Sequence, residues 1–124
     1  MQRDKKKIVV AEDEMIIALD VKVLLRKLGF DEVSIVRSGK KLVEESKLIS
    51  PDLIITDIML ADNISGIDAV RSIKEEKNVP VLFIAGFGNE NYIEDAKSIS
   101  PMGLLFKPFN SGELKNKVRT LLEN

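Results

Sequence analysis

Five short apolar runs divide the chain into similar units. They lie at residues 8–11, 33–36, 53–57, 81–85 and 103–106, each bounded by charged residues, Gly or Pro. Runs of four or five apolar and β-branched residues are too short for a helix and are typical of strands. A nearly continuous apolar run indicates a strand that is buried on both faces of a sheet. The pattern therefore predicts five strands with other elements covering both sides.

The segments between these runs carry apolar residues at helical spacing. The residues expected to face inward are, helix by helix, Ile17, Val21, Leu24, Leu25 and Leu28; Leu42, Val43 and Leu48; Ile67, Val70 and Ile73; Tyr92, Ile93, Ala96 and Ile99; and Leu114, Val118, Leu121 and Leu122. Ser65 with Asp68 and Asn110 with Glu113 have the spacing of a capping box, and Asn89 is expected to cap the fourth helix. Strands alternating with helices predict a parallel sheet with right-handed crossovers and helices on both faces.

Composition narrows the class of protein. A chain of 124 residues, with 44% hydrophobic and 31% charged residues, is expected to form one globular domain over residues 1–124. A net charge of −1 provides no general attraction to nucleic acid or to a membrane surface. No apolar run approaches the roughly 20 residues of a transmembrane helix, so we expect a cytoplasmic protein. The absence of cysteine and histidine excludes thiolate metal sites and Ser-His-Asp triads.

Acidic residues follow two of the predicted strands. Asp57 ends the third run, where a carboxylate is expected at the exposed edge, and Glu12 and Asp13 follow the first run. Parallel strands place their carboxyl ends at one edge of the sheet, where ligands bind. Three converging carboxylates repel one another unless a cation neutralises them, and oxygen ligands favour Mg²⁺. The alternative is that Glu12 and Asp13 only solvate a loop.

Lys107 directly follows the fifth run and is therefore expected at the same edge. An ammonium group beside a carboxylate and metal cluster suits a phosphoryl group. The alternative is a lysine that faces solvent in a turn.

Together these motifs resemble the receiver domain of two-component response regulators, over essentially the whole chain. Glu12-Asp13 is similar to the family's acidic pair, Asp57 to its phospho-accepting aspartate, and Lys107-Pro108-Phe109 to its Lys-Pro-Phe signature. Gly66 fits the glycine that follows the phosphorylation loop, although this loop is one residue longer than the commonest form and lacks its usual proline. The resemblance implies a flavodoxin-like, doubly wound, five-stranded parallel sheet with strand order 2-1-3-4-5 and five helices.

The resemblance also implies a chemistry. A histidine kinase or a phosphotransfer protein would donate a phosphoryl group to Asp57. The implied Mg²⁺ ligands are Asp13, Asp57 and the backbone carbonyl of Met59, with Glu12 acting through water. Lys107 would bind a phosphoryl oxygen, and the peptide bond before Pro108 would be cis. Phosphoryl transfer depends on positioning and charge neutralisation more than on acid-base groups, so a chain without histidine can support it.

Four positions bear on how such a receiver would respond. The family usually has Thr or Ser at the end of the fourth strand and Tyr or Phe early in the fifth, where this chain has Ala85 and Leu104. The usual switch is therefore expected to be atypical, and Phe106 is expected to belong to the core. In related receivers the side chains at the positions of Met59 and Phe87 govern access of water to the phosphoryl group. Both are bulky and apolar here, so slow self-dephosphorylation is expected.

Four interpretations follow from the sequence. The leading one is a phosphorylatable receiver with an atypical output switch, with no enzymatic activity beyond self-phosphorylation and self-dephosphorylation and with no direct binding to nucleic acid or membrane. The second is a receiver-like docking module that is insensitive to phosphate. The third is a small haloacid-dehalogenase-like phosphatase with Asp57 as nucleophile, but that chemistry requires a second acid where this chain has Met59. The fourth is a flavodoxin-like cofactor binder, which would need a phosphate-cradling loop where the first strand leads into acids.

The sequence leaves the output partner open, and it fits either a stand-alone regulator or the receiver of a larger protein.

Overall fold

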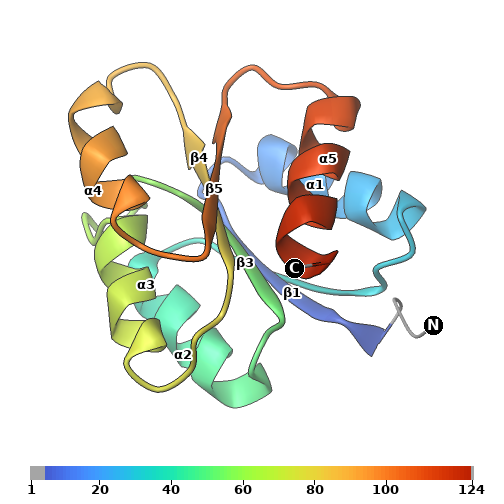
Figure 1. Ribbon diagram of the computed structural model, residues 1–124, viewed down its shortest axis with the longest axis horizontal. Helices are drawn as coiled ribbons and strands as arrows, with labels where there is room; N and C mark the ends of the chain where they lie inside the picture. The colour runs from blue at the N-terminus through green and yellow to red at the C-terminus, as the bar shows by residue number, and fades with distance from the viewer. Residues whose placement is uncertain (1–4, 124) are drawn as a thin grey trace.

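The strands form one parallel sheet. In a computed structural model of the protein, which describes residues 5–123, five strands pair in the order β2-β1-β3-β4-β5 (Figure 1). All four pairings are parallel. The flavodoxin-like order and the five helices predicted from the sequence are confirmed.

Each predicted strand and helix is present. The strands are β1 (Lys7–Ala11), β2 (Glu32–Val36), β3 (Leu53–Asp57), β4 (Val81–Ala85) and β5 (Met102–Phe106). The helices are α1 (Met15–Lys27), α2 (Gly39–Ile49), α3 (Gly66–Lys74), α4 (Ile93–Lys97) and α5 (Ser111–Glu123), with a 3₁₀ turn, η2 (Glu90–Tyr92), before α4. Within residues 5–123 no helix has both the length and the apolar character that crossing a bilayer requires.

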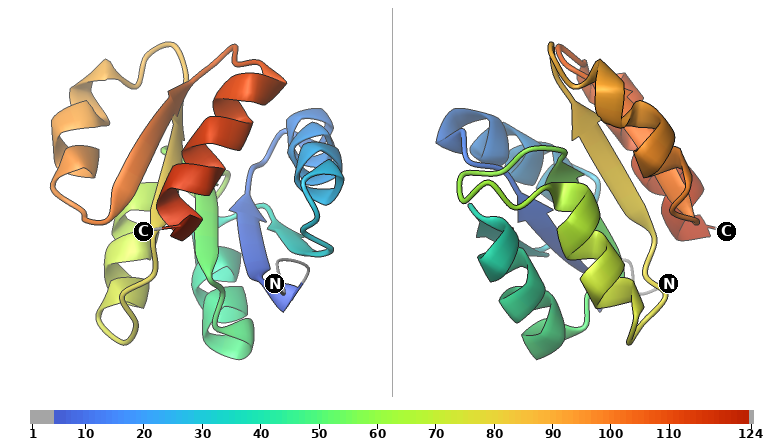
Figure 2. Two further views of the ribbon diagram at one scale, coloured as in Figure 1. Left: turned by 45° about the vertical axis from the view of Figure 1, so that its right-hand side comes forward. Right: turned by 90° about the vertical axis from the view of Figure 1, so that its left-hand side faces the viewer.

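Two apolar layers enclose the sheet. Helices α1 and α5 pack on one face, and α2, α3 and α4 pack on the other (Figures 1 and 2). Every residue of β3 and β4 is buried. These two strands lie inside the sheet between both layers, which explains why their sequences read as continuous apolar runs.

The prediction that Leu48 faces inward is wrong, because its side chain is 80% exposed. Helix α2 turns Leu42 and Ser46 toward the sheet, and Ile49 packs against the same layer. Leu48 follows Leu42 by about one and two-thirds helical turns, so it projects away from that face. A small polar residue, Ser46, occupies the inward position that the apolar pattern did not reveal.

The prediction that Phe106 belongs to the core is also wrong, since its side chain is 56% exposed. It ends the edge strand β5, which pairs only with β4. The neighbouring helix α4 has only five residues, and the side chain at the end of the strand stays exposed. Leu104, two residues earlier, is partly buried against the layer of α2, α3 and α4.

The segment before α4 differs from the predicted helix. Asn89 makes no side-chain cap; its Oδ1 instead accepts a hydrogen bond from the Gly86 amide at 2.7 Å. The side chain thereby closes the turn after β4, and regular α-helix begins only at Ile93. Tyr92, predicted to face inward, is 38% exposed, whereas Ala96 and Ile99 are buried as expected.

The two predicted capping boxes lie at helix starts. Ser65 Oγ accepts a hydrogen bond from the Asp68 amide at 3.0 Å at the start of α3. At α5 the bonds are reciprocal: Asn110 Oδ1 accepts from the Glu113 amide at 2.8 Å, and Glu113 Oε1 accepts from the Asn110 amide at 3.0 Å. These bonds satisfy amides that have no partner within the helix.

Asp62, in the loop after β3, caps the start of α2. Its Oδ1 accepts from the Gly39 amide at 2.9 Å and its Oδ2 from the Lys40 amide at 3.0 Å. The Gly39 amide contributes most to lowering the pKa of Asp62, because its hydrogen bond favours the ionised carboxylate. The loop that follows Asp57 is therefore attached to α2 by this side chain.

Asp62→Ala is expected to lower the free energy of unfolding by about 1 kcal/mol, the usual value of a helix cap. Because the pKa of Asp62 is lowered in the fold, this contribution is present above the unfolded pKa of 3.8 and is lost as the pH falls below it. Urea unfolding at neutral and acidic pH measures both effects. Asp31→Ala, at an exposed position, is the control. Equal losses in the two variants at neutral pH would show that the cap contributes nothing.

Candidate functional site

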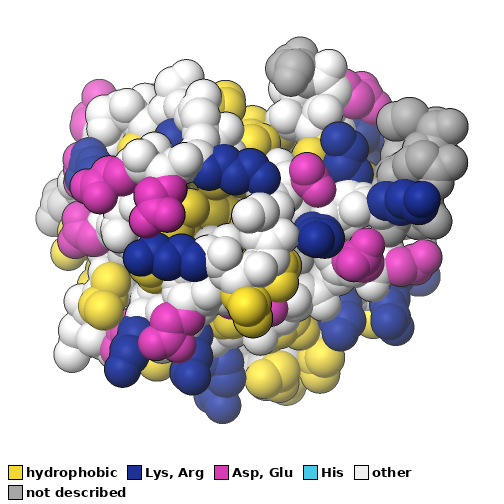
Figure 3. Space-filling view, turned by 90° about the horizontal axis from the view of Figure 1, so that it is seen from below, with side chains coloured by type: hydrophobic (Ala, Val, Ile, Leu, Met, Phe, Trp, Pro, Cys, Tyr) yellow, Lys and Arg dark blue, Asp and Glu magenta, His cyan; other side chains and the backbone are white. Residues whose placement is uncertain are grey.

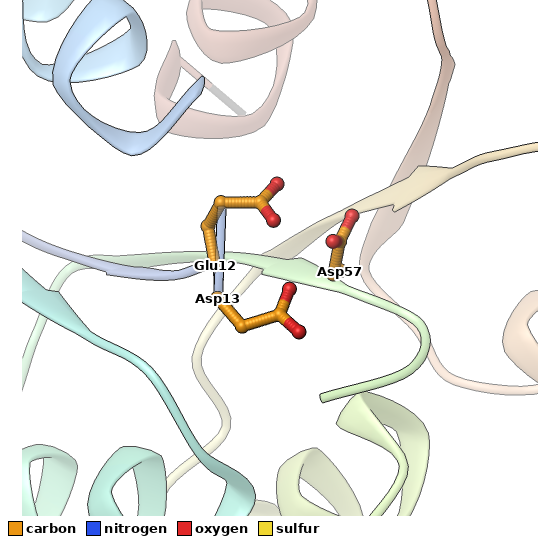
Figure 4. Close-up of side chains that lie close together, drawn as sticks. All are labelled: Glu12, Asp13 and Asp57. Carbon is orange, nitrogen blue, oxygen red and sulfur yellow. The ribbon is translucent and has the colours of Figure 1, made fainter. Parts of the chain in front are cut away.

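Three carboxylates meet at the carboxyl edge of the sheet. Glu12 and Asp13 follow β1 and extend their carboxyl groups toward Asp57, the last residue of β3 (Figure 4). One oxygen from each of the three lies within 4.8 Å of the others. The predicted convergence is therefore present, and the alternative that Glu12 and Asp13 only solvate a loop is wrong.

Asp57 is more buried than the sequence indicated. It lies at the predicted edge, but only 7% of the residue is exposed. Burial, followed by the neighbouring Glu12 carboxyl, raises the pKa of Asp57 to about 8, against the opposing effect of Lys107. Without a cation, the site therefore disfavours the ionised form of Asp57.

Lys107 lies among these acids. Its Nζ is 3.2 Å from Asp57 Oδ2 and 3.3 Å from both Glu12 Oε1 and Glu14 Oε1. Its amide donates to the Ala85 carbonyl at 2.9 Å, which holds the end of β5 against the end of β4. Burial alone would lower the pKa of Lys107, but the charges of Asp57 and Glu12 together raise it. The alternative of a lysine facing solvent is wrong, and the predicted cis peptide bond before Pro108 is present.

Glu12 has an unusual environment for a carboxylate. It is 1% exposed, and its Oε2 accepts from the Glu14 amide at 3.0 Å. Its Oε1 forms the ion pair with Lys107 but accepts no hydrogen bond of good geometry. A buried carboxylate oxygen with spare acceptor capacity, next to two further carboxylates, fits a hard divalent cation such as Mg²⁺.

The loop after Asp57 requires a glycine at its end. A Cβ on Gly66 would lie 2.1 Å from the Asp57 carbonyl oxygen and 2.8 Å from Thr56 Oγ1. The Gly66 amide donates to the Ile58 carbonyl at 2.6 Å, and Met59 pairs with Ser65 across the loop. This close approach explains the glycine singled out in the sequence. It also fixes the backbone of Met59 in the loop that directly follows Asp57.

The predicted switch and tuning positions differ in their surroundings. Ala85 is buried at the end of β4, opposite Phe106 in the register, and its methyl group offers no hydroxyl. Met59 is 38% exposed, and Phe87 is entirely exposed. Phe87 and Lys107 line an open, mainly apolar pocket of about 470 Å³ together with Ile17, Gly86, Pro108 and Phe109.

Sequence reasoning missed Glu14 as a residue of the site. Only Glu12 and Asp13 were singled out after the first strand, whereas the structure also brings the carboxylate of Glu14 to Lys107, 93 residues away. A third consecutive acid was the only available signal. Arg37 was also missed; its Nη2 donates to the Asp13 carbonyl at 3.2 Å.

A pocket of about 240 Å³ lies at the opposite edge of the molecule, where α2 and α3 end. Figure 3 shows this edge, with hydrophobic side chains in a hollow among lysines and acids. Its lysines are already paired: Lys77 Nζ donates to the Ser50 carbonyl at 3.2 Å, and Lys47 lies 3.7 Å from Glu76. No carboxylate cluster accompanies this pocket among the described residues, so the acid cluster is the candidate site.

Comparison with known protein families identifies the receiver domain of response regulators, whose model matches residues 8–119. The transcriptional regulatory protein PdtaR of Mycobacterium tuberculosis is 31% identical over 109 residues, which cover 88% of this chain and 53% of PdtaR. The phyllosphere-induced regulator PhyR of Methylorubrum extorquens is 37% identical over 105 residues, which cover 82% of this chain and 38% of PhyR. The chain thus spans about half the length of the first relative and less of the second.

Solved structures agree with this assignment. A response regulator receiver protein from Sinorhizobium medicae is 31% identical, with a TM-score of 0.84 and coverage of 95% of this chain and 94% of the other. The receiver domain of PhyR from Erythrobacter litoralis is 30% identical, with a TM-score of 0.83 and coverage of 95% and 90%. By family match, sequence identity and fold, this chain belongs to the response regulator receiver domains of two-component signalling.

Proposed function

We propose that this receiver accepts a phosphoryl group on Asp57 from the phosphohistidine of a kinase or a phosphotransfer protein. The observation that supports this most is the position of Lys107 Nζ, 3.2 Å from Asp57 Oδ2. The oxygens of Glu12 and Asp13 lie within 4.8 Å of that of Asp57 at the same edge. The arrangement combines a nucleophile, a fixed positive charge and a cation site, the parts that phosphoryl transfer requires.

In the proposed transfer, a carboxylate oxygen of Asp57 forms a bond to phosphorus while the bond between phosphorus and the donor nitrogen breaks. The electron pair of that bond leaves with the imidazole nitrogen. Lys107 binds a phosphoryl oxygen and neutralises part of the charge. The protein functions in this proposal as a phosphoacceptor, with no enzymatic turnover of an external substrate.

The proposed Mg²⁺ ligands are Asp13, Asp57 and the backbone carbonyl of Met59, with Glu12 acting through water. When bound, Mg²⁺ supplies positive charge that keeps the carboxylates ionised and neutralises the phosphoryl oxygens. The buried Glu12 Oε1, which lacks a hydrogen bond of good geometry, supports this assignment.

The test is incubation with Mg²⁺ and a small phosphodonor, followed by intact mass measurement. We expect the mass to increase by one phosphoryl group, and we expect EDTA to prevent the increase. A stoichiometric increase that persists in EDTA would contradict the metal assignment. No increase under any condition would contradict the phosphoacceptor proposal itself.

A second candidate function is a docking module that is insensitive to phosphate. The methyl group of Ala85 at the end of β4, where the family has a hydroxyl, favours it. Lack of labelling combined with binding to a partner would support this alternative.

In either case we propose a single domain over residues 1–124 that acts in the cytoplasm, alone or as part of a longer regulator, without direct contact to nucleic acid or membrane.

The phosphorylated form is expected to lose its phosphoryl group slowly, because the bulky side chain of Met59, two residues after Asp57, is expected to restrict access of the attacking water. Met59→Asn should accelerate the loss several-fold. Phe87→Glu should accelerate it less, because Phe87 is entirely exposed and shields the site poorly. Release of phosphate from the purified phosphoprotein in the presence of Mg²⁺, after the phosphodonor has been removed, measures both rates. A half-life of seconds in the unmodified protein would contradict the expectation.

A further inference from the structure

Lys107 has as many carboxylate neighbours as its ammonium group has hydrogens. An ammonium group has three N–H donors, and here Asp57, Glu12 and Glu14 each place an oxygen 3.2–3.3 Å from Nζ. Asp57 and Glu14 accept hydrogen bonds from Nζ, while Glu12 lies at ion-pair distance. A phosphoryl oxygen that approaches Lys107 therefore competes with these carboxylates for the ammonium group. The three contacts differ in what their loss would cost.

Glu12 and Asp57 are poor candidates for release. Glu12 is 1% exposed, and its Oε1 makes no hydrogen bond to any residue that the structure describes, so losing Lys107 would leave a buried carboxylate without its counter-charge. The side chain of Asp57 is 10% exposed, and it carries the incoming group itself. Glu14, by contrast, is 64% exposed, so water can solvate its carboxylate as soon as it leaves the lysine.

The position of Glu14 in the fold also indicates that its contact with Lys107 is the one that breaks. It is the N-cap residue of α1, with extended backbone angles, but its side chain makes no hydrogen bond to the amides of the helix. Ser, Thr, Asp and Asn at this position usually accept such bonds, whereas the longer side chain of Glu14 does not. The carboxylate of Glu14 turns instead to Lys107, which lies at the end of β5.

We propose that Glu14 is a positioning residue that holds Lys107 in the unphosphorylated protein and is displaced by a phosphoryl oxygen. This inference rests on the proposed function of Asp57. Because Glu14 is anionic, it competes with the phosphoryl group for the same ammonium and repels the approaching phosphoryl charge. Glu14 therefore weakens the attraction of the site for phosphate analogues while it keeps Lys107 directed at Asp57.

The experiment titrates the full chain with beryllofluoride in the presence of Mg²⁺ and follows amide NMR signals near Asp57. Glu14→Gln, nearly identical in shape, should bind the analogue about two- to fivefold more tightly, the range that an exposed ion pair produces. The gain should shrink at high salt, because exposed charges are screened. The ¹³Cε shift of Lys107 should change in the same variant, which reports on the contact itself.

Asp20→Asn is the matched control. Asp20 lies on the same helix, is exposed, and loses the same charge. It should leave both the affinity and the Lys107 shift unchanged. Equal affinities for Glu14→Gln and Asp20→Asn, with the wild type still binding, would overturn this inference alone. Absence of any adduct in the wild type would overturn the proposed function and this inference with it.

Discussion

Asp57→Asn is expected to abolish phosphoryl incorporation and, in the metal-free protein at neutral pH, to stabilise the fold. The first effect follows because an amide is not a nucleophile toward phosphorus under these conditions. The second follows because Asp57 is 7% exposed and lies beside the buried Glu12, where an ionised carboxylate is unfavourable. Asparagine removes this charge at nearly constant volume. Loss of function with gain of stability distinguishes a functional carboxylate from a structural one.

The stabilisation should depend on pH in a defined direction. The pKa of Asp57 is raised from 3.8 to about 8 in the fold, so between these values the folded protein binds a proton that the unfolded chain does not. The free energy of unfolding of the metal-free wild type should therefore fall as the pH rises through this range. In Asp57→Asn this contribution to the slope is absent, and the advantage of the variant should grow with pH.

Urea unfolding in EDTA at about pH 5 and about pH 8 measures this difference. Added Mg²⁺ should then raise the Tm of the wild type more than that of Asp57→Asn, because the wild type supplies one more ligand and gains more from neutralisation. Asp31→Asn, at an exposed position, is the control for a general charge effect. Identical pH profiles of the free energy of unfolding for wild type and Asp57→Asn would mean that burial does not raise the pKa of Asp57. Full labelling of the variant would move the acceptor to another residue.

The layers of the fold could be predicted because burial on both faces leaves a clear pattern. β3 and β4 are entirely buried, and their continuous apolar sequences indicate this directly. Leu48 and Phe106 were misplaced because each is apolar without being covered. Leu48 lies on the outer face of its own helix α2, whereas the cover over Phe106 depends on α4, which is shorter than the sequence indicated.

The central site could be predicted because a parallel sheet gathers the ends of its strands. Correct assignment of the strands was enough to predict that the site brings together Asp13, Asp57 and Lys107. Glu14 and Asp62 could not be placed in this way, since their partners depend on the path of loops. Asp62 reaches α2 from the loop after β3, and Glu14 reaches Lys107 from the first turn of α1. Such contacts between distant segments leave no periodic signal.

The helix α4 is attached to α3, which bears on how the receiver responds. The guanidinium of Arg71 forms an ion pair with Asp95, and its Nη2 donates to Ser98 Oγ at 3.0 Å. These contacts link α4 to α3 at the surface of the protein. Ala85 cannot donate to a phosphoryl oxygen, and a hydrogen bond to a charged group is worth about 1.5–3 kcal/mol. The hydrogen bond that usually draws the end of β4 toward the phosphoryl group is therefore absent, and Arg71 links α4 to α3.

The surface formed by α4 and β5 is consequently expected to change only slightly when the unmodified protein binds beryllofluoride. Ala85→Thr would supply a hydroxyl whose buried position makes a phosphoryl oxygen its natural partner. Leu104→Tyr would supply a ring in a partly buried position of β5 that can turn inward. Because hydroxyl and ring act together, the double variant should change more than the two single variants summed, with a coupling energy of about 0.5–3 kcal/mol.

Amide shifts and hydrogen exchange on α4 and β5, recorded with and without beryllofluoride, measure the response of all four proteins. The coupling energy follows from their four affinities for the analogue. Arg71→Gln is a useful companion, because releasing α4 from α3 should enlarge the response of the double variant further. Strict additivity of the single variants would show that hydroxyl and ring act independently in this fold. A large response of α4 and β5 in the unmodified protein would show that the signal reaches this surface without a hydroxyl at position 85, and the explanation based on Ala85 would be wrong.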